Sequence, residues 1–249
     1  MPLLSVVTIF KDEEKNLAAT LQSLLSQAFT NFECLLVNGN SRDSSLEIIQ
    51  KHTGSDPRFH VYEEEGTGIS NAFNQAILLS KSEHLLFLNG GDLLSSSEAL
   101  SLLYTLAQQH PNSIVTGRSE YIAENGERTG KLYPPKLYHR SKLEWHCAIS
   151  HQATLIPQSF FRKNGGYIPS FQIAMDYELW LRAVRIKYAI IATTHVVAYH
   201  REGGASAKNI NRGRKEQICA RLLHLPNWRC SLIKDIIQLW LILTSNWKS

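Results

Sequence analysis

The sequence predicts a single α/β domain in which a mainly parallel β-sheet is covered by helices on both faces. Three observations favour this class. Strand-like and helix-like segments alternate through the first third of the chain, the strand-like segments are continuous apolar runs, and each ends in a polar turn. Such strands are typical of parallel sheets that are buried on both faces. The chain has 249 residues and is 43% hydrophobic, which is enough for a sizeable core.

Four strands are expected in this first part of the chain. They are rich in β-branched, aromatic and leucine side chains and cover residues 5–9, 32–37, 59–63 and 84–88. In parallel sheets ligands bind beyond the carboxyl ends of the strands. The turns that follow these four runs are therefore the first places to look for a binding site.

Helices are expected between the strands, because apolar residues recur there at intervals of three and four. Asp12 stands where an N-cap would open a helix over residues 13–27, and Ser41 can cap a second helix that carries Leu46 and Ile49. A third helix is expected at 71–80.

After about Leu100 the pattern changes to shorter strands and polar turns. We expect a hairpin around residues 114–135, a helix that opens at Asp176, and one or two strands within 188–199. The pattern places one domain at residues 1–206. Residues 207–249 are predicted to form a C-terminal helical extension.

Charge and cysteine content exclude several classes of function. The chain has 26 basic and 22 acidic residues, and this mild net charge of +4 does not indicate a nucleic-acid partner. The four cysteines form no CxxC pair, so neither a disulfide framework nor a structural zinc site is expected.

The first residues lack the basic start and cleavage site of a leader. A cytoplasmic protein fits these features.

The C-terminal segment 230–247 is strongly apolar, but it contains Lys234, Asp235 and Gln238 and is too polar for a confident membrane-spanning helix. It can lie at a membrane surface with Trp240 and Trp247 at headgroup depth, or it can be a core or dimer helix. The sequence leaves both interpretations open.

The turn "FLNGGDLL", residues 87–94, follows the fourth strand and presents one carboxylate, Asp92. One or two carboxylates together with phosphate oxygens suffice to hold Mg²⁺ or Mn²⁺, although an Asp after two glycines is also an ordinary turn residue or helix N-cap. No GxxxxGK[ST] motif is present, and the first turn, "FKDEEKN", has no glycine. These absences exclude the dinucleotide-binding fingerprint and disfavour a nucleotidyltransferase.

Seven motifs in order resemble the inverting family 2 glycosyltransferases with the GT-A fold, particularly those that build bacterial exopolysaccharides such as colanic acid. The resemblance covers residues 4–206, and the motifs are "SVVTIFKDEEKNLAATLQSLLSQ", "LLVNGNSRDSS", "GTGISNAFNQAI", "FLNGGDLL", "SHQATLIP", "AMDYELWLR" and "HREGGAS". The GT-A fold is a three-layer, Rossmann-like α/β/α arrangement, and the resemblance implies that this chain adopts it.

The resemblance also implies roles for individual residues. Asp92 would hold a divalent cation, Mn²⁺ or Mg²⁺, and Asp176 would be the catalytic base. His151 and Gln152 would contact the acceptor, although a lone histidine is more often a structural residue. The residues implied in binding the nucleotide-sugar donor are Thr8, Phe10, Asn38, Gly39, Gly68, Asn71, Asn74, Asn89 and Arg201. Arg201 belongs to a segment that would close over the diphosphate.

The implied activity is transfer of one sugar, with inversion, from a UDP- or GDP-sugar to a growing glycan. The acceptor would be a lipid-linked oligosaccharide at the inner face of the cytoplasmic membrane, where the protein would be peripheral. The chain departs from the family pattern because Asn38 and Asn71 stand where an aspartate is usual, and Gly91 stands where many members have an acid. An amide keeps its hydrogen bonds but loses the charge. The alternative is therefore a weakly active or inactive nucleotide-sugar-binding scaffold.

Overall fold

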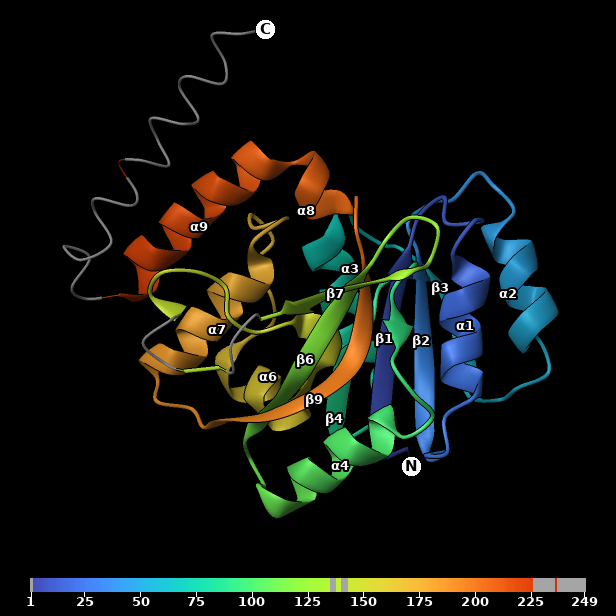
Figure 1. The fold of residues 1–249 in the computed structure, drawn as a ribbon, viewed down its shortest axis with the longest axis horizontal. Coiled ribbons are helices and arrows are strands. Elements are labelled where there is room, and N and C mark those ends of the chain that lie inside the picture. Colours follow the sequence, from blue (N-terminus) through green and yellow to red (C-terminus); the bar gives the residue numbers. More distant parts are fainter. Residues whose placement is uncertain (1, 135–137, 140–142, 226–235, 237–249) are drawn as a thin grey trace, which may run out of the picture.

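The computed structural model describes residues 2–134, 138–139, 143–225 and 236. Within them, nine strands form one sheet in the order β3-β2-β1-β4-β8-β6-β9-β5, with β7 paired to β6. Helices cover both faces of this sheet (Figure 1). The layered α/β arrangement expected from the sequence is therefore present.

The first half of the sheet is parallel, as predicted. Its strands are β1 (Leu4–Phe10), β2 (Phe32–Asn38), β3 (Phe59–Glu63) and β4 (His84–Phe87). β1 lies between β2 and β4, and β2 also pairs with β3. The register places Phe10 opposite Asn38, so the turns that follow β1 and β2 meet at one edge of the sheet.

The second half makes the sheet mixed. β8 (Thr154–Pro157) runs antiparallel to β4 and to β6 (Ile114–Ile122), and β6 forms the expected hairpin with β7 (Arg128–Tyr133). The segment near 188–199 is one long strand, β9 (Ile190–Arg201), which is parallel to β6. β9 also pairs antiparallel with the two-residue strand β5 (Leu93–Leu94), and this pairing brings the end of β9 beside the turn after β4.

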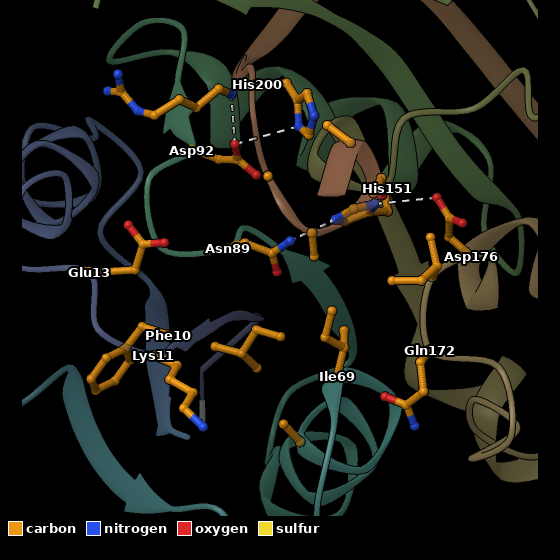
Figure 2. Close-up of a pocket in the computed structure, with 18 of the residues that line it drawn as sticks. Phe10, Lys11, Glu13, Ile69, Asn89, Asp92, His151, Gln172, Asp176 and His200 are labelled. Carbon is orange, nitrogen blue, oxygen red and sulfur yellow. Dashed lines mark hydrogen bonds and ion pairs between the residues drawn. The ribbon is translucent and has the colours of Figure 1, made fainter. Parts of the chain in front are cut away.

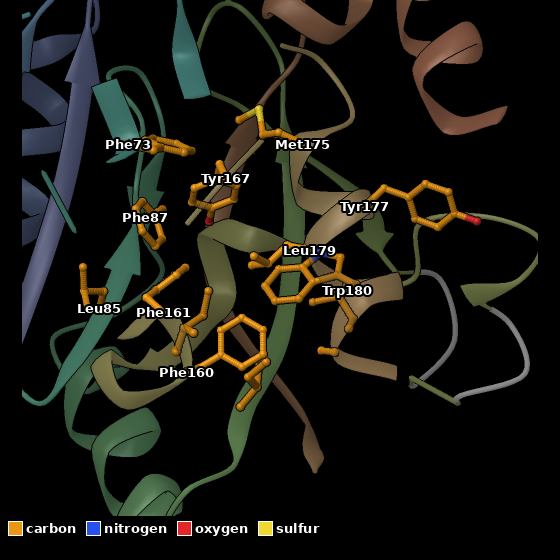
Figure 3. Packing of buried hydrophobic residues seen from close by; sticks show 14 of the residues in the cluster. Phe73, Leu85, Phe87, Phe160, Phe161, Tyr167, Met175, Tyr177, Leu179 and Trp180 are labelled. Atoms are coloured by element: carbon orange, nitrogen blue, oxygen red, sulfur yellow. The ribbon is translucent and has the colours of Figure 1, made fainter. Parts of the chain in front are cut away.

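Alternate side chains of the central strands point into two separate cores. Val6 lies in the core beneath α1 (Leu17–Leu25), α2 (Ser45–Thr53) and α4 (Ala99–Gln109). The neighbouring Val7 lies in the core beneath α3 (Ile69–Leu79), α6 (Gln158–Asn164) and α7 (Met175–Arg185). This second core is aromatic: Phe73 of α3 packs on Phe87 of β4 and on Tyr167 (Figure 3).

Two of the predicted helix caps were wrong. Asp12 has a φ of 52°, and its carboxylate accepts a hydrogen bond from the Arg42 backbone N–H at 2.8 Å, so Asp12 joins two turns and does not open α1. Ser44, and not Ser41, precedes α2; the Ser41 hydroxyl accepts from the Asp12 N–H at 3.0 Å. Asp176 lies in the first turn of α7, whose N-cap is Ala174.

The chain after β9 folds back onto the domain. The short helix α8 (Ala205–Lys208) leads into α9 (Ile210–His224), which packs along α7 (Figure 1). His224 lies 2.7 Å from the fully buried Glu178 of α7. Trp240, Trp247 and most of the predicted membrane-surface helix lie outside the described residues. No helix in the described part of the chain has the length and apolar character to cross a membrane.

Candidate active site

A cavity of about 760 Å³ opens at the edge of the sheet where β1, β2 and β4 end (Figure 2). Its walls come from segments that are far apart in the sequence. Phe10 ends β1, Gly39 follows β2, and Asn89 lies in the turn after β4. The starts of α3 and α7 and the end of β9 complete it. The cavity therefore lies where ligands bind in parallel α/β sheets.

Each glycine of "FLNGGD" is needed at its position for a different structural reason. A Cβ on Gly90 would approach the Cβ of Phe10 to 3.0 Å, so the turn can lie against the end of β1 only without a side chain there. Gly91 has a φ of 93°, which other residues rarely adopt, and its N–H donates to Thr20 Oγ1 at 2.9 Å. This turn is what directs Asp92 toward the cavity.

Asp92 is almost fully buried and held on both oxygens. Its Oδ1 accepts a hydrogen bond from the Arg201 N–H and its Oδ2 accepts one from Gln152 Nε2, both at 3.0 Å. His200 Nδ1 lies 3.5 Å from Oδ1. Burial by itself raises the pKa of the Asp92 carboxyl, but the charge and hydrogen bonding of His200, with the other two donors, lower it below its usual value. Asp92 is thus kept as a carboxylate.

Asp176 faces the same cavity from the opposite wall. His151 connects it to the turn that contains Asp92, because His151 Nδ1 lies 3.4 Å from Asp176 Oδ2 and His151 Nε2 lies 3.3 Å from Asn89 Nδ2 (Figure 2). The other oxygen of Asp176, Oδ1, accepts the Tyr177 N–H at the start of α7. The two carboxylates therefore lie across one cavity, joined by Asn89 and His151.

The structure brings part of the predicted donor set to the cavity. Five of those residues line it, namely Phe10, Gly39, Gly68, Asn89 and Arg201. The other four do not, namely Thr8, Asn38, Asn71 and Asn74. Thr8 is buried within β1. Asn71 donates to the Thr67 carbonyl at 2.7 Å.

Asn38 and Asn74 use their amides to hold the protein itself. Asn38 donates to Glu63 Oε2 at 2.9 Å and accepts the Ser41 N–H at 2.9 Å. An aspartate at position 38 would bring a second carboxylate against Glu63, which explains why this chain has an amide there. Asn74 both donates to and accepts from the backbone of Tyr167, at 2.8 Å in each case.

The side chain of Arg201 is also engaged. Its guanidinium donates to the backbone carbonyls of Gly91 at 3.2 Å, Ala123 at 3.1 Å and Glu124 at 2.9 Å. The resemblance implied that this residue belongs to a segment that closes over the diphosphate. In the structure it fixes the loop of Gly91 and the end of β6 around Asp92.

The predicted acceptor residues lie at the junction of two cavities. His151 lines the first cavity and also a second one of about 370 Å³, on which Gln152 and Asp176 also lie. Gln152 is 3% exposed, and its amide holds Asp92, so its contact with an acceptor is limited to the small part of its side chain that remains open.

The roles implied by the motifs left out several residues of the site. Lys11, Glu13, Glu64 and His200 all line the first cavity. His200 was missed because its position depends on the pairing of Leu93 with Tyr199, which joins segments more than a hundred residues apart. Glu13 lies in the first turn, and burial raises the pKa of its carboxyl even though Asn16 donates a hydrogen bond to it.

The oxygen atoms that line the site suit a divalent cation that a phosphate group also binds. Among the described residues no group of three His, Cys, Asp or Glu side chains lies close enough to hold a metal alone. Asp92 supplies a carboxylate, and Asn89 Oδ1 is buried without a hydrogen-bond partner in the described chain. Hard oxygen ligands of this kind, completed by phosphate and water, match Mg²⁺ or Mn²⁺.

Comparison with known proteins decides the family. The profile described as Glycosyl transferase family 2 matches residues 5–164, which include β1 to β4, the "FLNGGD" turn and His151. The chain belongs to glycosyl transferase family 2. The match ends before Asp176 and Arg201, so the roles of those two residues depend on the geometry described above.

Curated relatives of this family 2 chain include two enzymes with names in glycan synthesis and one uncharacterized protein. It is 24% identical over 182 residues to a chondroitin synthase of Escherichia coli, and 24% identical over 209 residues to a PGL/p-HBAD biosynthesis glycosyltransferase of Mycobacterium bovis. The first match covers 73% of this chain and 26% of the relative, and the second covers 82% and 79%. An uncharacterized Sinorhizobium fredii protein, y4gI, is 28% identical over 187 residues, 74% of this chain and 20% of its own length.

Solved structures confirm the predicted GT-A fold. S. aureus TarS 1-349 in complex with UDP-GlcNAc superposes with a TM-score of 0.70 at 16% identity, over 88% of this chain and 66% of that TarS fragment. The mannosyltransferase PcManGT from Pyrobaculum calidifontis, in complex with GDP-Man and Mn²⁺, gives 0.66 at 15% identity, over 88% and 63%. At these identities the likeness establishes the fold alone.

Proposed function

We propose that this family 2 chain transfers a sugar from a UDP- or GDP-sugar to a hydroxyl of a glycan acceptor, with inversion of configuration. One observation carries the proposal: Asp92 and Asp176 lie on opposite walls of one cavity and are joined through Asn89 and His151. A volume of about 760 Å³ is within the range of pockets that hold ligands of this size.

Asp176 is the proposed base. Inversion requires a carboxylate that takes the proton of the attacking hydroxyl as the new glycosidic bond forms, on the face of the sugar away from the diphosphate. Asp176 lies opposite Asp92 and lines both the first and the second cavity. It therefore suits an acceptor that enters through the second cavity. His151 and the Tyr177 N–H hold the two oxygens of Asp176 in place.

A divalent cation is proposed at Asp92 and Asn89. The first cavity is acidic: five carboxylates line it (Glu13, Glu64, Asp92, Asp176 and Glu202) against three lysine or arginine residues (Lys11, Lys131 and Arg201). Arg201 is already bonded to backbone carbonyls. Carboxylates therefore outnumber lysine and arginine side chains around a diphosphate in this cavity, and a divalent cation would offset their repulsion. When bound, the cation supplies the Lewis acidity that stabilises charge on the departing nucleoside diphosphate.

The acceptor and the place of action are further parts of the proposal. Three relatives or neighbours carry names that refer to polymer or glycolipid synthesis or to a sugar-nucleotide complex, namely the chondroitin synthase, the PGL/p-HBAD enzyme and TarS with UDP-GlcNAc. These names support only transfer of sugars in the synthesis of larger glycan-containing products. The lipid-linked, exopolysaccharide-type acceptor and the peripheral position at the inner face of the cytoplasmic membrane are proposed from the sequence resemblance.

A ligand panel tests the proposed activity. UDP, GDP, CDP and dTDP are added to the purified chain with and without Mn²⁺, and the melting temperature is measured, because a ligand that binds the native state raises it. The corresponding sugar nucleotides are then followed for release of the nucleoside diphosphate. We expect one nucleoside diphosphate to raise the melting temperature in the presence of Mn²⁺. We also expect the corresponding sugar nucleotide to be hydrolysed slowly. Binding without turnover across the whole panel would favour the scaffold alternative.

A further inference from the structure

Helix α9 forms one wall of the second cavity and is fixed there. The carboxylate of Glu216 accepts backbone N–H bonds from Gln172, Ile173 and Ala174, at 2.7 to 3.1 Å, directly before α7 begins. Arg212 holds the same carboxylate at 2.8 Å. Helix α7 carries Asp176. These bonds therefore fix α9, and the cavity wall that α9 forms, relative to the proposed base.

The face of α9 that lines this cavity includes Arg214 and Gln217, which are three residues apart and so project from one side of the helix. Across the cavity lie Tyr121, His151 and Asp176. The cavity therefore combines an aromatic side chain, an amide and a guanidinium around the carboxylate that would activate an acceptor.

Arg214 is half-buried, and its guanidinium has no ion-pair or hydrogen-bond partner among the described residues. This differs from Arg212, Arg182 and Arg201, which bond to carboxylates or carbonyls. Arg214 lines the second cavity and not the first, so a donor diphosphate in the first cavity is not its partner. A guanidinium in such a cavity is well suited to bind a carboxylate or phosphate.

We propose that the second cavity binds the acceptor and that Arg214 recognises an anionic group, a carboxylate or a phosphate, next to the accepting sugar. The inference rests on the proposed function and adds to it a class of acceptor: an acidic glycan or a sugar attached through a phosphate. It also makes α9, which lies outside the matched family segment, part of the specificity of the site.

Three sugar derivatives of similar size serve as probes. Methyl β-glucuronide carries a carboxylate, a methyl glucosyl phosphodiester carries a phosphate, and methyl β-glucoside is neutral. Dissociation constants are measured for the full chain by calorimetric titration, in the presence of Mn²⁺ and with UDP or GDP present or absent. Arg214→Gln is the test variant. Lys215→Gln is the matched control, because Lys215 is the next residue on α9 and is exposed.

We expect at least one acidic probe to bind about tenfold more tightly than the neutral one, which is the usual worth of a charge-assisted hydrogen bond. Arg214→Gln should remove this preference, and Lys215→Gln should keep it. The probe that shows the preference identifies the source, a sugar carboxylate or a linking phosphate.

Three results would each overturn the inference. They are equal binding of acidic and neutral probes, no binding of either acidic probe, and the same loss of the acidic preference in Arg214→Gln and Lys215→Gln. Hydrolysis of the sugar nucleotide by the unmodified chain, without any acceptor, reports separately on the proposed function. A chain that hydrolyses its donor but has no preference for acidic probes therefore overturns the inference alone.

Discussion

His151 connects the two walls of the cavity: its Nε2 lies 3.3 Å from Asn89 Nδ2 and its Nδ1 lies 3.4 Å from Asp176 Oδ2. An amide nitrogen can only donate, so the contact with Asn89 leaves the imidazole proton on Nδ1, where it can be donated to Asp176. The side chain of His151 thus orients the proposed base from the turn that carries Asp92.

The first prediction concerns this orientation. His151→Ala should lower kcat by at least about tenfold while the KM for the donor changes little, because the carboxylate of Asp176 loses the group that positions it. Steady-state kinetics of donor turnover measure both constants. His195→Ala is the control, since His195 is exposed on β9 and does not line this cavity. An unchanged kcat in His151→Ala would contradict the positioning role.

The second prediction concerns the amide at position 38. Asn38→Asp replaces a donor to Glu63 with a second carboxylate and should lower the free energy of unfolding by about 1 kcal/mol. The double variant Asn38→Asp with Glu63→Gln restores a donor and acceptor pair and should recover most of this loss. Urea denaturation of the four proteins of the cycle gives the coupling energy. Additive effects would show that the two side chains do not interact.

The third prediction is a pH dependence at Glu216. Burial raises the pKa of this carboxyl, but the three backbone N–H bonds and Arg212 lower it below its ordinary value of 4.5 in the folded chain. A lowered pKa in the folded state means that the stabilisation is complete above the unfolded value and is lost as the pH falls through the folded one. Glu216→Gln should therefore cost about 2 kcal/mol at pH 7.

The loss of unfolding free energy in Glu216→Gln should shrink as the pH falls below about 4.5. At such pH the carboxyl of Glu216 in the unmodified chain becomes protonated and, like the glutamine, carries no charge. Chemical denaturation of both proteins between pH 7 and pH 3 measures the difference. Glu47→Gln, an exposed substitution on α2, should show no such trend. A constant difference across this range would mean that the charge of Glu216 does not hold the turn before α7.

Local sequence patterns predicted the parallel half of the sheet well, because each of its strands is a continuous apolar run. The strand at 59–63 was predicted with its observed bounds, and the others were close. The pattern missed α4 and β8: β8 has only four residues, and α4 lies where turns were expected. Helix caps were misassigned because Asp12 and Ser41 bond to each other's loops across 29 residues.

The candidate site was predictable where a motif stands at a strand end. Asp92, Asn89 and Gly39 lie in the turns that follow β4 and β2, and all three line the cavity. Asn74 has its amide turned to the backbone of Tyr167, 93 residues away, and a motif match carries no information on that contact. His200 likewise reaches Asp92 only through the pairing of β5 with β9.

The most direct test of the account is Mn²⁺-dependent release of nucleoside diphosphate from the sugar nucleotide that the ligand panel identifies, compared among the unmodified chain, Asp92→Asn and Asp176→Asn. The account predicts turnover only with the metal, loss of both turnover and Mn²⁺-dependent nucleotide binding in Asp92→Asn, and loss of turnover with binding retained in Asp176→Asn. Turnover that survives in either variant, or that does not depend on Mn²⁺ or Mg²⁺, would contradict it.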